Sequence, residues 1–179
     1  MININTSALL IIDMQEKLVK AANGSSEIVN NMKKLADTAK ILNIPTIVTE
    51  QYPKGLGKTV ETLEINNNET ITIEKTAFSA LLESEFAEEI QSLNRKQIII
   101  GGIETHICVL QTAADLISEG YEVYVVKDAC VSRTSFNHET GLELLKQYGA
   151  KITSTEIVLF ELLKTSKHPN FKEIQALIK

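Results

Sequence analysis

The segment QIIIGGIETHICVLQTA, residues 97–113, passes from one kind of secondary structure to another. Its aliphatic beginning has the composition of a buried strand, and the residues from about Thr105 onward are predicted to form a helix. Gly101 and Gly102 lie between them, where glycine lets the backbone turn sharply and approach a ligand closely. A buried strand that leads directly into a helix is typical of α/β proteins.

Five further runs of aliphatic and β-branched residues have the length of short strands. Between most of them, apolar residues recur at the three- and four-residue spacing of a helix face. Continuous apolar strands that alternate with helices predict a parallel sheet covered on both faces, and therefore an α/β domain. The further runs are ALLIID (8–13), PTIVTE (45–50), TITIEK (70–75), YEVYVVKD (121–128) and AKITST (150–155), and the helical stripes are Ile28, Met32, Leu35, Ala39 and Leu42, then Leu81, Phe86, Ile90 and Leu93, then Leu142, Leu145 and Tyr148.

Length and charge limit the classes of function. The chain has 179 residues, of which 44% are hydrophobic and 23% charged, as is ordinary for a globular protein. No repeat or linker interrupts it, so we predict a single domain over residues 1–179. The net charge of −5 argues against nucleic acid as a partner, because phosphate contacts require basic side chains. No apolar run approaches the roughly eighteen residues of a membrane span, so no membrane partner is expected.

The N-terminal sequence MININTSALLIIDMQ lacks the basic leader of a signal peptide, and its apolar run ends at an aspartate. We interpret it as the first strand of a cytoplasmic protein. The N-x-[ST] sequences at Asn5, Asn23 and Asn68 are therefore interpreted as chance matches. Two cysteines, Cys108 and Cys130, are too few for a disulfide framework, and Cys130 is interpreted as a structural thiol.

Residues 51–69 form the longest segment without a periodic pattern. The segment contains Pro53, Gly55, Gly57 and three consecutive asparagines. A loop of that length is more often a lid or a binding loop than a simple connection.

Reactive side chains follow three of the predicted strands. In an open α/β sheet, ligands bind beyond the carboxyl ends of the strands, near the point where the strand order reverses. Asp13 follows LLII, Lys75 ends TITIEK, and Cys108 comes shortly after QIIIGG. Two of them have a plainer interpretation, because Asp13 can cap a helix that begins near Met14, and Lys75 can extend its ammonium group to water.

Cys108 is expected in the first turn of its helix and outside the apolar stripe. In that turn the unpaired backbone N–H groups and the helix dipole favour a thiolate, which is the reactive form of cysteine. The same N–H groups can serve as an oxyanion hole, so the segment can form an acyl-transfer site. The predicted buried stripe consists of Ile107, Leu110, Ala114 and Ile117, whereas Cys108 shares a face with Thr112 and Asp115.

Other uses of the thiol have less support in the sequence. Cys108 and Cys130 lack the C-x-x-C spacing of a redox pair. His106 lies two residues before Cys108, and side chains at that spacing do not face each other on a helix. The three histidines, His106, His138 and His168, show no metal-binding spacing.

Three segments in order, ALLIIDMQ, EKTAFSAL and GGIETHICVLQTA, resemble the isochorismatase-like cysteine hydrolases. The sequences TEQYPKGLGKTV (49–60) and HPNFKEIQALIK (168–179) are most similar to the subgroup of isochorismatase-domain-containing proteins. The resemblance extends from about Ala8 to the C-terminus. It implies a three-layer α/β/α fold on a six-stranded parallel sheet with Rossmann-type order, and assembly into a homo-oligomer.

The resemblance also implies an Asp–Lys–Cys catalytic triad, which falls here on Asp13, Lys75 and Cys108. It implies a cis peptide bond at Ile103–Glu104 and an oxyanion hole made by the N–H groups of Glu104 and Cys108. Nicotinamidases of this superfamily carry an Asp and two His metal ligands after the second strand. The corresponding residues here, TEQYPKGLG, contain no histidine, so we expect neither a metal nor another cofactor.

The expected function is therefore the hydrolysis of a C–N bond in a small amide or carbamoyl compound, through a thioester on Cys108. A non-catalytic binding or regulatory protein with the same fold, and isochorismatase-type hydrolysis, are the alternatives. The small-molecule pocket is expected near Gln15, Tyr52 and Phe78, each of which can equally be an ordinary packing or surface residue.

Overall fold

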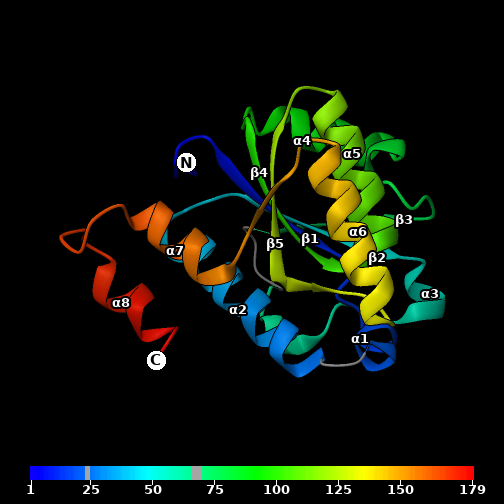
Figure 1. Ribbon diagram of the computed structural model, residues 1–179, viewed down its shortest axis with the longest axis horizontal. Helices are drawn as coiled ribbons and strands as arrows, with labels where there is room; N and C mark the ends of the chain where they lie inside the picture. Colours follow the sequence, from blue (N-terminus) through cyan, green and yellow to red (C-terminus); the bar gives the residue numbers. More distant parts are fainter. Residues whose placement is uncertain (23–24, 66–69) are drawn as a thin grey trace.

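A computed structural model describes residues 1–22, 25–65 and 70–179. Its centre is a six-stranded sheet in the order β3-β2-β1-β4-β5-β6, in which all neighbouring strands are parallel (Figure 1). The strand order reverses between β1 and β4, as the predicted Rossmann-type order requires. The strands are β1 (Ser7–Ile12), β2 (Thr46–Gln51), β3 (Thr70–Lys75), β4 (Gln97–Ile103), β5 (Glu122–Val131) and β6 (Lys151–Thr153).

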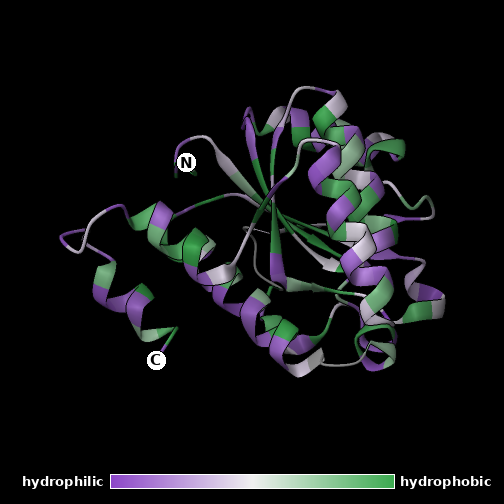
Figure 2. Ribbon diagram, in the orientation of Figure 1, coloured by the Kyte–Doolittle hydropathy of each residue, from purple (hydrophilic) through white to green (hydrophobic). Residues whose placement is uncertain are grey.

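Helices cover both faces of the sheet and complete a three-layer α/β/α fold, which confirms the predicted architecture. Helices α2 and α7 pack on one face, and α4, α5 and α6 pack on the other. In Figure 2 the central strands are mostly hydrophobic, whereas the helices carry both hydrophobic and hydrophilic residues. The helices are α1 (Glu16–Ala21), α2 (Ser25–Ile41), α3 (Pro53–Leu56), α4 (Ser84–Ser92), α5 (Leu110–Ser118), α6 (Ser135–Gln147), α7 (Thr155–Leu163) and α8 (Phe171–Ala176), with short turns η1 (Glu61–Leu63), η2 (Ala80–Leu82) and η3 (Thr105–Val109).

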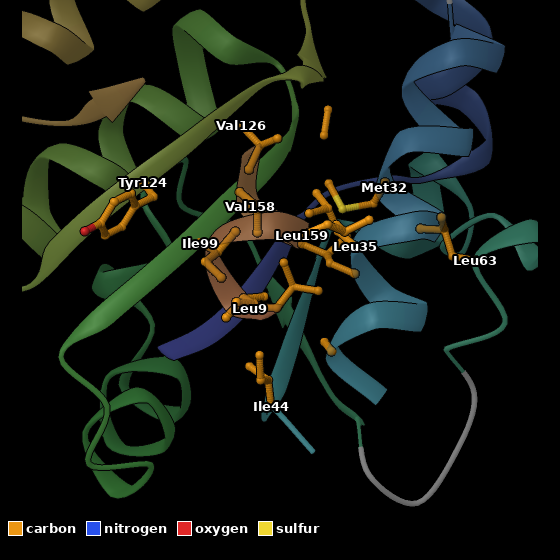
Figure 3. Packing of buried hydrophobic residues seen from close by; sticks show 14 of the residues in the cluster. Leu9, Met32, Leu35, Ile44, Leu63, Ile99, Tyr124, Val126, Val158 and Leu159 are labelled. Atoms are coloured by element: carbon orange, nitrogen blue, oxygen red, sulfur yellow. The ribbon is translucent and has the colours of Figure 1, made fainter. Parts of the chain in front are cut away.

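Strand β1 contributes to both hydrophobic cores because alternate side chains of a strand point to opposite faces. Leu9 packs with Met32 and Leu35 of α2 and with Val158 and Leu159 of α7 (Figure 3). Its neighbour Leu10 belongs to the core on the other face. A strand that is buried on both sides therefore reads as a continuous apolar run, which is why ALLIID could be assigned from the sequence.

The helix after β4 begins with a π-helical turn, η3, and this turn changes which residues are buried. A π turn contains an extra residue relative to an α-helical turn, so every later side chain is shifted around the helix axis. The predicted stripe of Ile107, Leu110, Ala114 and Ile117 is consequently wrong, since all four are only partly buried. The buried positions are Cys108, Val109, Thr112, Ala113 and Leu116.

The two glycines after QIII lie inside β4, and their close approach is to neighbouring strands. A β-carbon on Gly102, whose φ is 138°, would clash with the carbonyl oxygen of Ile12 in β1. A β-carbon on Gly101 would lie 2.9 Å from the carbonyl oxygen of Ala129 in β5. The expectation that these glycines approach a ligand is therefore corrected, because the space above them is taken by β1 and β5.

The segment predicted as an irregular lid, 51–69, is only partly described, since residues 66–69 lie outside the described ranges. Its described part contains α3 and η1 and is bonded to the framework. The buried Glu50 carboxylate accepts hydrogen bonds from the Thr59 N–H at 2.7 Å and the Thr59 hydroxyl at 2.8 Å. The Val60 N–H donates to the Met14 carbonyl at 2.9 Å. These bonds hold the described part to Glu50 and Met14, and its role as a lid or a binding loop stays a prediction.

The structure describes only one of the three N-x-[ST] matches. Asn23 and Asn68, two of the three chance N-x-[ST] matches, lie outside the described residues, whereas Asn5 is exposed. Within the described ranges, no helix has both the length and the apolar character needed to cross a bilayer.

Candidate active site

Asp13 follows β1 at the point where the sheet order reverses. Its backbone takes a left-handed conformation with φ of 51°, and its N–H donates to the Thr49 carbonyl at 3.1 Å. The side chain is completely buried, and its Oδ1 accepts a hydrogen bond from the Thr49 hydroxyl at 2.7 Å. The helix-cap interpretation of Asp13 is wrong, because α1 begins only at Glu16 and Gln15 occupies its N-cap position.

Lys75, the last residue of β3, turns inward to Asp13. Its Nζ lies 2.8 Å from Asp13 Oδ2, and neither side chain is exposed. The ammonium group also donates to Gln51 Oε1 at 2.6 Å, and to the carbonyl oxygens of Ala77 at 3.2 Å and Phe78 at 3.3 Å. A buried charge is stable only with such partners, so the interpretation of Lys75 as a lysine that reaches to water is corrected.

Cys108 lies in η3 beside this ion pair, with 7% of its surface exposed. Burial raises the pKa of the Cys108 thiol to about 12, and the charge of Asp13 and a hydrogen bond with it act in the same direction. Lys75 opposes them by favouring the thiolate. The expectation that the helix start makes Cys108 a thiolate is therefore wrong for the resting protein, because desolvation and the carboxylate of Asp13 outweigh the ammonium group of Lys75.

The three residues singled out in the sequence thus meet at one place. Asp13 follows β1, Lys75 ends β3 and Cys108 lies in η3 after β4, and the charges of Asp13 and Lys75 both act on the pKa of Cys108, so both lie near it. A protonated thiol in contact with a carboxylate can form a nucleophile only if the carboxylate takes its proton. This arrangement is suited to general-base activation of a cysteine.

The backbone before Cys108 has the geometry that the family resemblance implied, since the Ile103–Glu104 peptide bond is cis. The Glu104 carbonyl accepts hydrogen bonds from the N–H groups of Ile107 at 3.1 Å and Val109 at 3.2 Å. The Glu104 carboxylate pairs with Arg133 Nε at 3.1 Å and accepts the Arg133 N–H at 2.9 Å. Glu104 is therefore held at both its backbone and its side chain.

The three candidate pocket residues differ in position. Gln15 is completely buried, and its amide bonds to the Gln51 carbonyl at 3.0 Å, the Gly57 carbonyl at 2.7 Å and the Gln51 N–H at 2.7 Å. These bonds show that Gln15 braces the loop, and its place in a substrate pocket stays a prediction. Tyr52 and Phe78 are 57% and 53% exposed. Both flank Lys75, because the Tyr52 N–H donates to the Lys75 carbonyl at 2.9 Å and the Phe78 carbonyl accepts from Lys75 Nζ.

Sequence reasoning missed Thr49 and Gln51, which bond directly to the buried ion pair. The sequence does contain a signal for both residues. Thr49 lies near the carboxyl end of the predicted strand PTIVTE, and Gln51 follows that strand directly. In a parallel sheet that end lies at the same edge as Asp13 and Lys75. Neither residue type suggests catalysis by itself, so only the proximity of the strand ends identifies them.

The raised pKa leads to a prediction about alkylation. In a Cys130→Ala background, iodoacetamide should react with Cys108 more slowly than with free cysteine near neutral pH. The rate should still be rising at about pH 10, whereas the rate of an ordinary thiol levels off above its pKa of about 8.5. Mass spectrometry of the modified peptide measures this rate. A plateau at the ordinary position would contradict the raised pKa.

Asp13→Asn provides the matched variant for that measurement. It removes the carboxylate that raises the pKa of Cys108 and keeps Lys75, which lowers it. The alkylation profile should therefore shift to lower pH, and the rate near neutral pH should increase. An unchanged profile would mean that burial alone determines the pKa of this thiol.

Comparison with known proteins shows the family of this chain. Residues 7–157 match the isochorismatase domain. The chain belongs to the isochorismatase family. Isochorismatase domain-containing protein 2 of Xenopus laevis is 44% identical to it over 174 residues, covering 97% of this chain and 83% of that protein.

Solved structures show the same isochorismatase fold. The MAR1 ribonuclease from Caenorhabditis elegans has a TM-score of 0.93 and 42% identity, and covers 99% of this chain and 91% of its own. YcaC from Pseudomonas aeruginosa, solved with hexane-2,5-diol and covalent acrylamide, has a TM-score of 0.93 and 26% identity over 98% of this chain and 90% of its own. YcaC from Escherichia coli, described as an octameric hydrolase of unknown specificity, has a TM-score of 0.89 and 26% identity over 98% of this chain and 94% of its own.

Among residues 1–22, 25–65 and 70–179, no three His, Cys, Asp or Glu side chains are grouped so that they could hold a metal ion. The carboxylate of Asp13 is paired with the ammonium group of Lys75.

Proposed function

We propose that this isochorismatase-family protein is a cysteine hydrolase that cleaves a C–N bond in a small amide or carbamoyl compound. The observation that carries the proposal is the buried Asp13–Lys75 pair, 2.8 Å apart, whose two charges both act on the pKa of the Cys108 thiol. The pair lies at the reversal of strand order, where α/β sheets bind their ligands.

The reaction begins from a neutral thiol. As the sulfur attacks the substrate carbonyl carbon, Asp13 accepts the thiol proton, and the carbonyl oxygen becomes an oxyanion that the N–H groups of Glu104 and Cys108 stabilise. Collapse of this intermediate breaks the C–N bond, and Asp13 gives its proton to the departing amine. The products of this half are the free amine and a thioester on Cys108.

Water completes the cycle. Asp13, again a carboxylate, accepts a proton from a water molecule that attacks the thioester carbonyl. The carbon–sulfur bond breaks, the acid product leaves, and the proton returns to the Cys108 sulfur. Lys75 compensates the charge of Asp13 before and after each transfer and adds positive charge beside the sulfur while it is anionic.

The raised pKa of Cys108 supports a role for Asp13 as the base. A thiol with a pKa of about 12 is almost entirely protonated near neutral pH, so it needs a proton acceptor in direct contact. The acrylamide bound covalently to YcaC from Pseudomonas aeruginosa supports a nucleophile in that relative, because nucleophiles such as thiols add to the C=C bond of acrylamide.

A second candidate function is that of a non-catalytic binding protein. The small exposed fraction of Cys108 and its raised pKa favour this candidate, because both make the thiol less reactive.

The similar structure named MAR1 ribonuclease, from Caenorhabditis elegans, suggests RNA as another ligand to test. The net charge of −5 disfavours RNA, which binds to basic surfaces.

A substrate panel tests the proposal. Small amides, carbamoyl compounds and ureas are assayed for ammonia release, with isochorismate and a short single-stranded RNA as separate arms. We expect ammonia from at least one amide or carbamoyl compound, together with a trapped acyl group on the Cys108 peptide after acid quenching. Turnover of isochorismate or RNA alone, or binding without turnover of any compound, would replace this proposal with the corresponding alternative.

We also propose that the chain assembles with copies of itself. The octameric state described for YcaC of Escherichia coli supports this. Tyr52, Phe78 and Leu82 of the candidate site region are large apolar side chains that are more than half exposed, with Leu82 at 72%. Exposed apolar groups of this kind are frequently covered at protein–protein interfaces.

A further inference from the structure

The turn that carries Cys108 is held by side chains from a part of the chain that the proposed chemistry does not use. His106 Nδ1 lies 2.9 Å from the Ser132 hydroxyl, and Glu104 is paired with Arg133. A third contact comes from α6, where His138 Nδ1 lies 2.8 Å from the hydroxyl oxygen of Thr105.

Thr105 connects His138 to the turn that carries Cys108. It is the first residue of η3, it is completely buried, and it lies three residues before Cys108 in the same π-helical turn. A π turn is less regular than an α-helical turn and occurs frequently at functional sites. The position of the Cys108 sulfur therefore depends on what fixes the beginning of this turn.

Helix α6 packs tightly enough against the turn to hold His138 in place. Gly141 lies three residues after His138, and residues at that spacing share one face of a helix. A β-carbon at Gly141 would lie 2.9 Å from the α-carbon of His106, so the helix and the turn are in direct backbone contact. The ring of His138 is thereby brought against the turn by the packing of its own helix.

His138 also lines a cavity. The cavity has a volume of about 440 Å³ and is also lined by Cys130, Asp128 and Lys127. Burial lowers the pKa of His138, so the ring is neutral near neutral pH and offers one donor and one acceptor nitrogen. Among the described residues, Thr105 is the hydrogen-bond partner that the ring has.

We propose that His138 is a positioning residue for Cys108, and that it acts through the hydroxyl of Thr105. The hydrogen bond holds η3 in the arrangement that keeps the sulfur in contact with Asp13. Loss of the bond lets the sulfur move away from the carboxylate. The thiol then becomes easier to ionise, and the proton transfer that starts the proposed reaction becomes slower.

The test uses paired variants in a Cys130→Ala background. Thr105→Val and His138→Leu remove the hydrogen bond, whereas Thr105→Ser and His138→Asn keep a hydrogen-bonding group at the same place. We expect Thr105→Val and His138→Leu to lower kcat about five- to tenfold with KM unchanged, the effect of one lost hydrogen bond. The conservative variants should recover most of kcat, and the double variant Thr105→Val/His138→Leu should be no slower than either single one.

Alkylation gives a second readout, which does not depend on the proposed hydrolysis. Thr105→Val and His138→Leu should move the pH profile of Cys108 alkylation to lower pH, and His138→Asn should not. If the wild-type protein turns over no substrate, this shift still tests the positioning role, so failure of the two proposals can be told apart.

Ile174→Val is the control for a general loss of stability. Ile174 is the buried residue of α8 and belongs to the core cluster that does not include Cys108, and this truncation is expected to cost about as much stability as one hydrogen bond. It should change neither kcat nor the alkylation profile. Equal losses in His138→Leu and His138→Asn, multiplied losses in the double variant, or the same profile shift in Ile174→Val would each overturn the proposal.

Discussion

Replacement of Cys108 by alanine is expected to abolish turnover, with a loss of at least about a thousandfold in kcat. The proposed reaction forms its only covalent bond to the protein through this sulfur, so no other group can replace it. Labelling of the protein by acrylamide or iodoacetamide at this position should disappear as well. Ammonia release from the active amide of the panel and peptide mass spectrometry measure the two effects.

Cys130→Ala is the matched control for that experiment. Cys130 is the other cysteine of the chain, and it is almost completely buried at 1% exposure. Burial raises the pKa of its thiol to about 12 as well, but it has no part in the proposed chemistry. We expect Cys130→Ala to keep turnover, and thermal unfolding should show that both variants remain folded. Unchanged turnover in Cys108→Ala would remove the nucleophile from the proposal.

Lys75→Met is expected to lower the free energy of unfolding by about 3–5 kcal/mol. The variant leaves the carboxylate of Asp13 buried without its cation, whereas the wild-type pair is 2.8 Å apart with neither side chain exposed. Turnover should also be lost, because nothing compensates the negative charge beside the sulfur. Urea-induced unfolding, followed by circular dichroism, measures the loss of stability.

Two comparison variants separate stability from chemistry. Lys127→Met breaks the ion pair with Glu139, in which the side chains are 49% and 57% exposed, and should cost no more than about 1 kcal/mol. The double variant Asp13→Asn/Lys75→Met removes both buried charges, so it should recover much of the stability while remaining inactive. Equal costs for Lys75→Met and Lys127→Met would show that the Asp13–Lys75 pair is not desolvated as the structure describes.

Much of the fold follows from local sequence patterns. A strand buried on both faces must be apolar at every position, so the continuous runs such as ALLIID and QIII identified the central strands. The stripe Ile28, Met32 and Leu35 likewise identified the buried face of α2, where Met32 and Leu35 belong to the core. The helix after β4 is the exception. A regular 3.6-residue period was assumed there, but the π turn at Thr105–Val109 shifts all later side chains around the helix axis, so different residues are buried.

The candidate site was predictable only in part. Asp13, Lys75 and Cys108 could be named because chemically reactive residues at the ends of parallel strands must lie along one edge of the sheet. Their partners could not be named in the same way. Thr49, Gln51 and His138 are common polar residues, and their importance arises only from which side chain lies within hydrogen-bond distance.

By itself, therefore, the sequence determined the α/β architecture and the identity of three reactive side chains. Buried strands appear in it as continuous apolar runs, and the reactive residues follow directly or shortly after those runs. Tertiary structure alone decided the state of those side chains. It turned Lys75 inward, and it kept Cys108 protonated against the expectation from its helix position. The physical reason is that ionisation depends on desolvation and on charges a few ångströms away, and those neighbours come from distant parts of the chain.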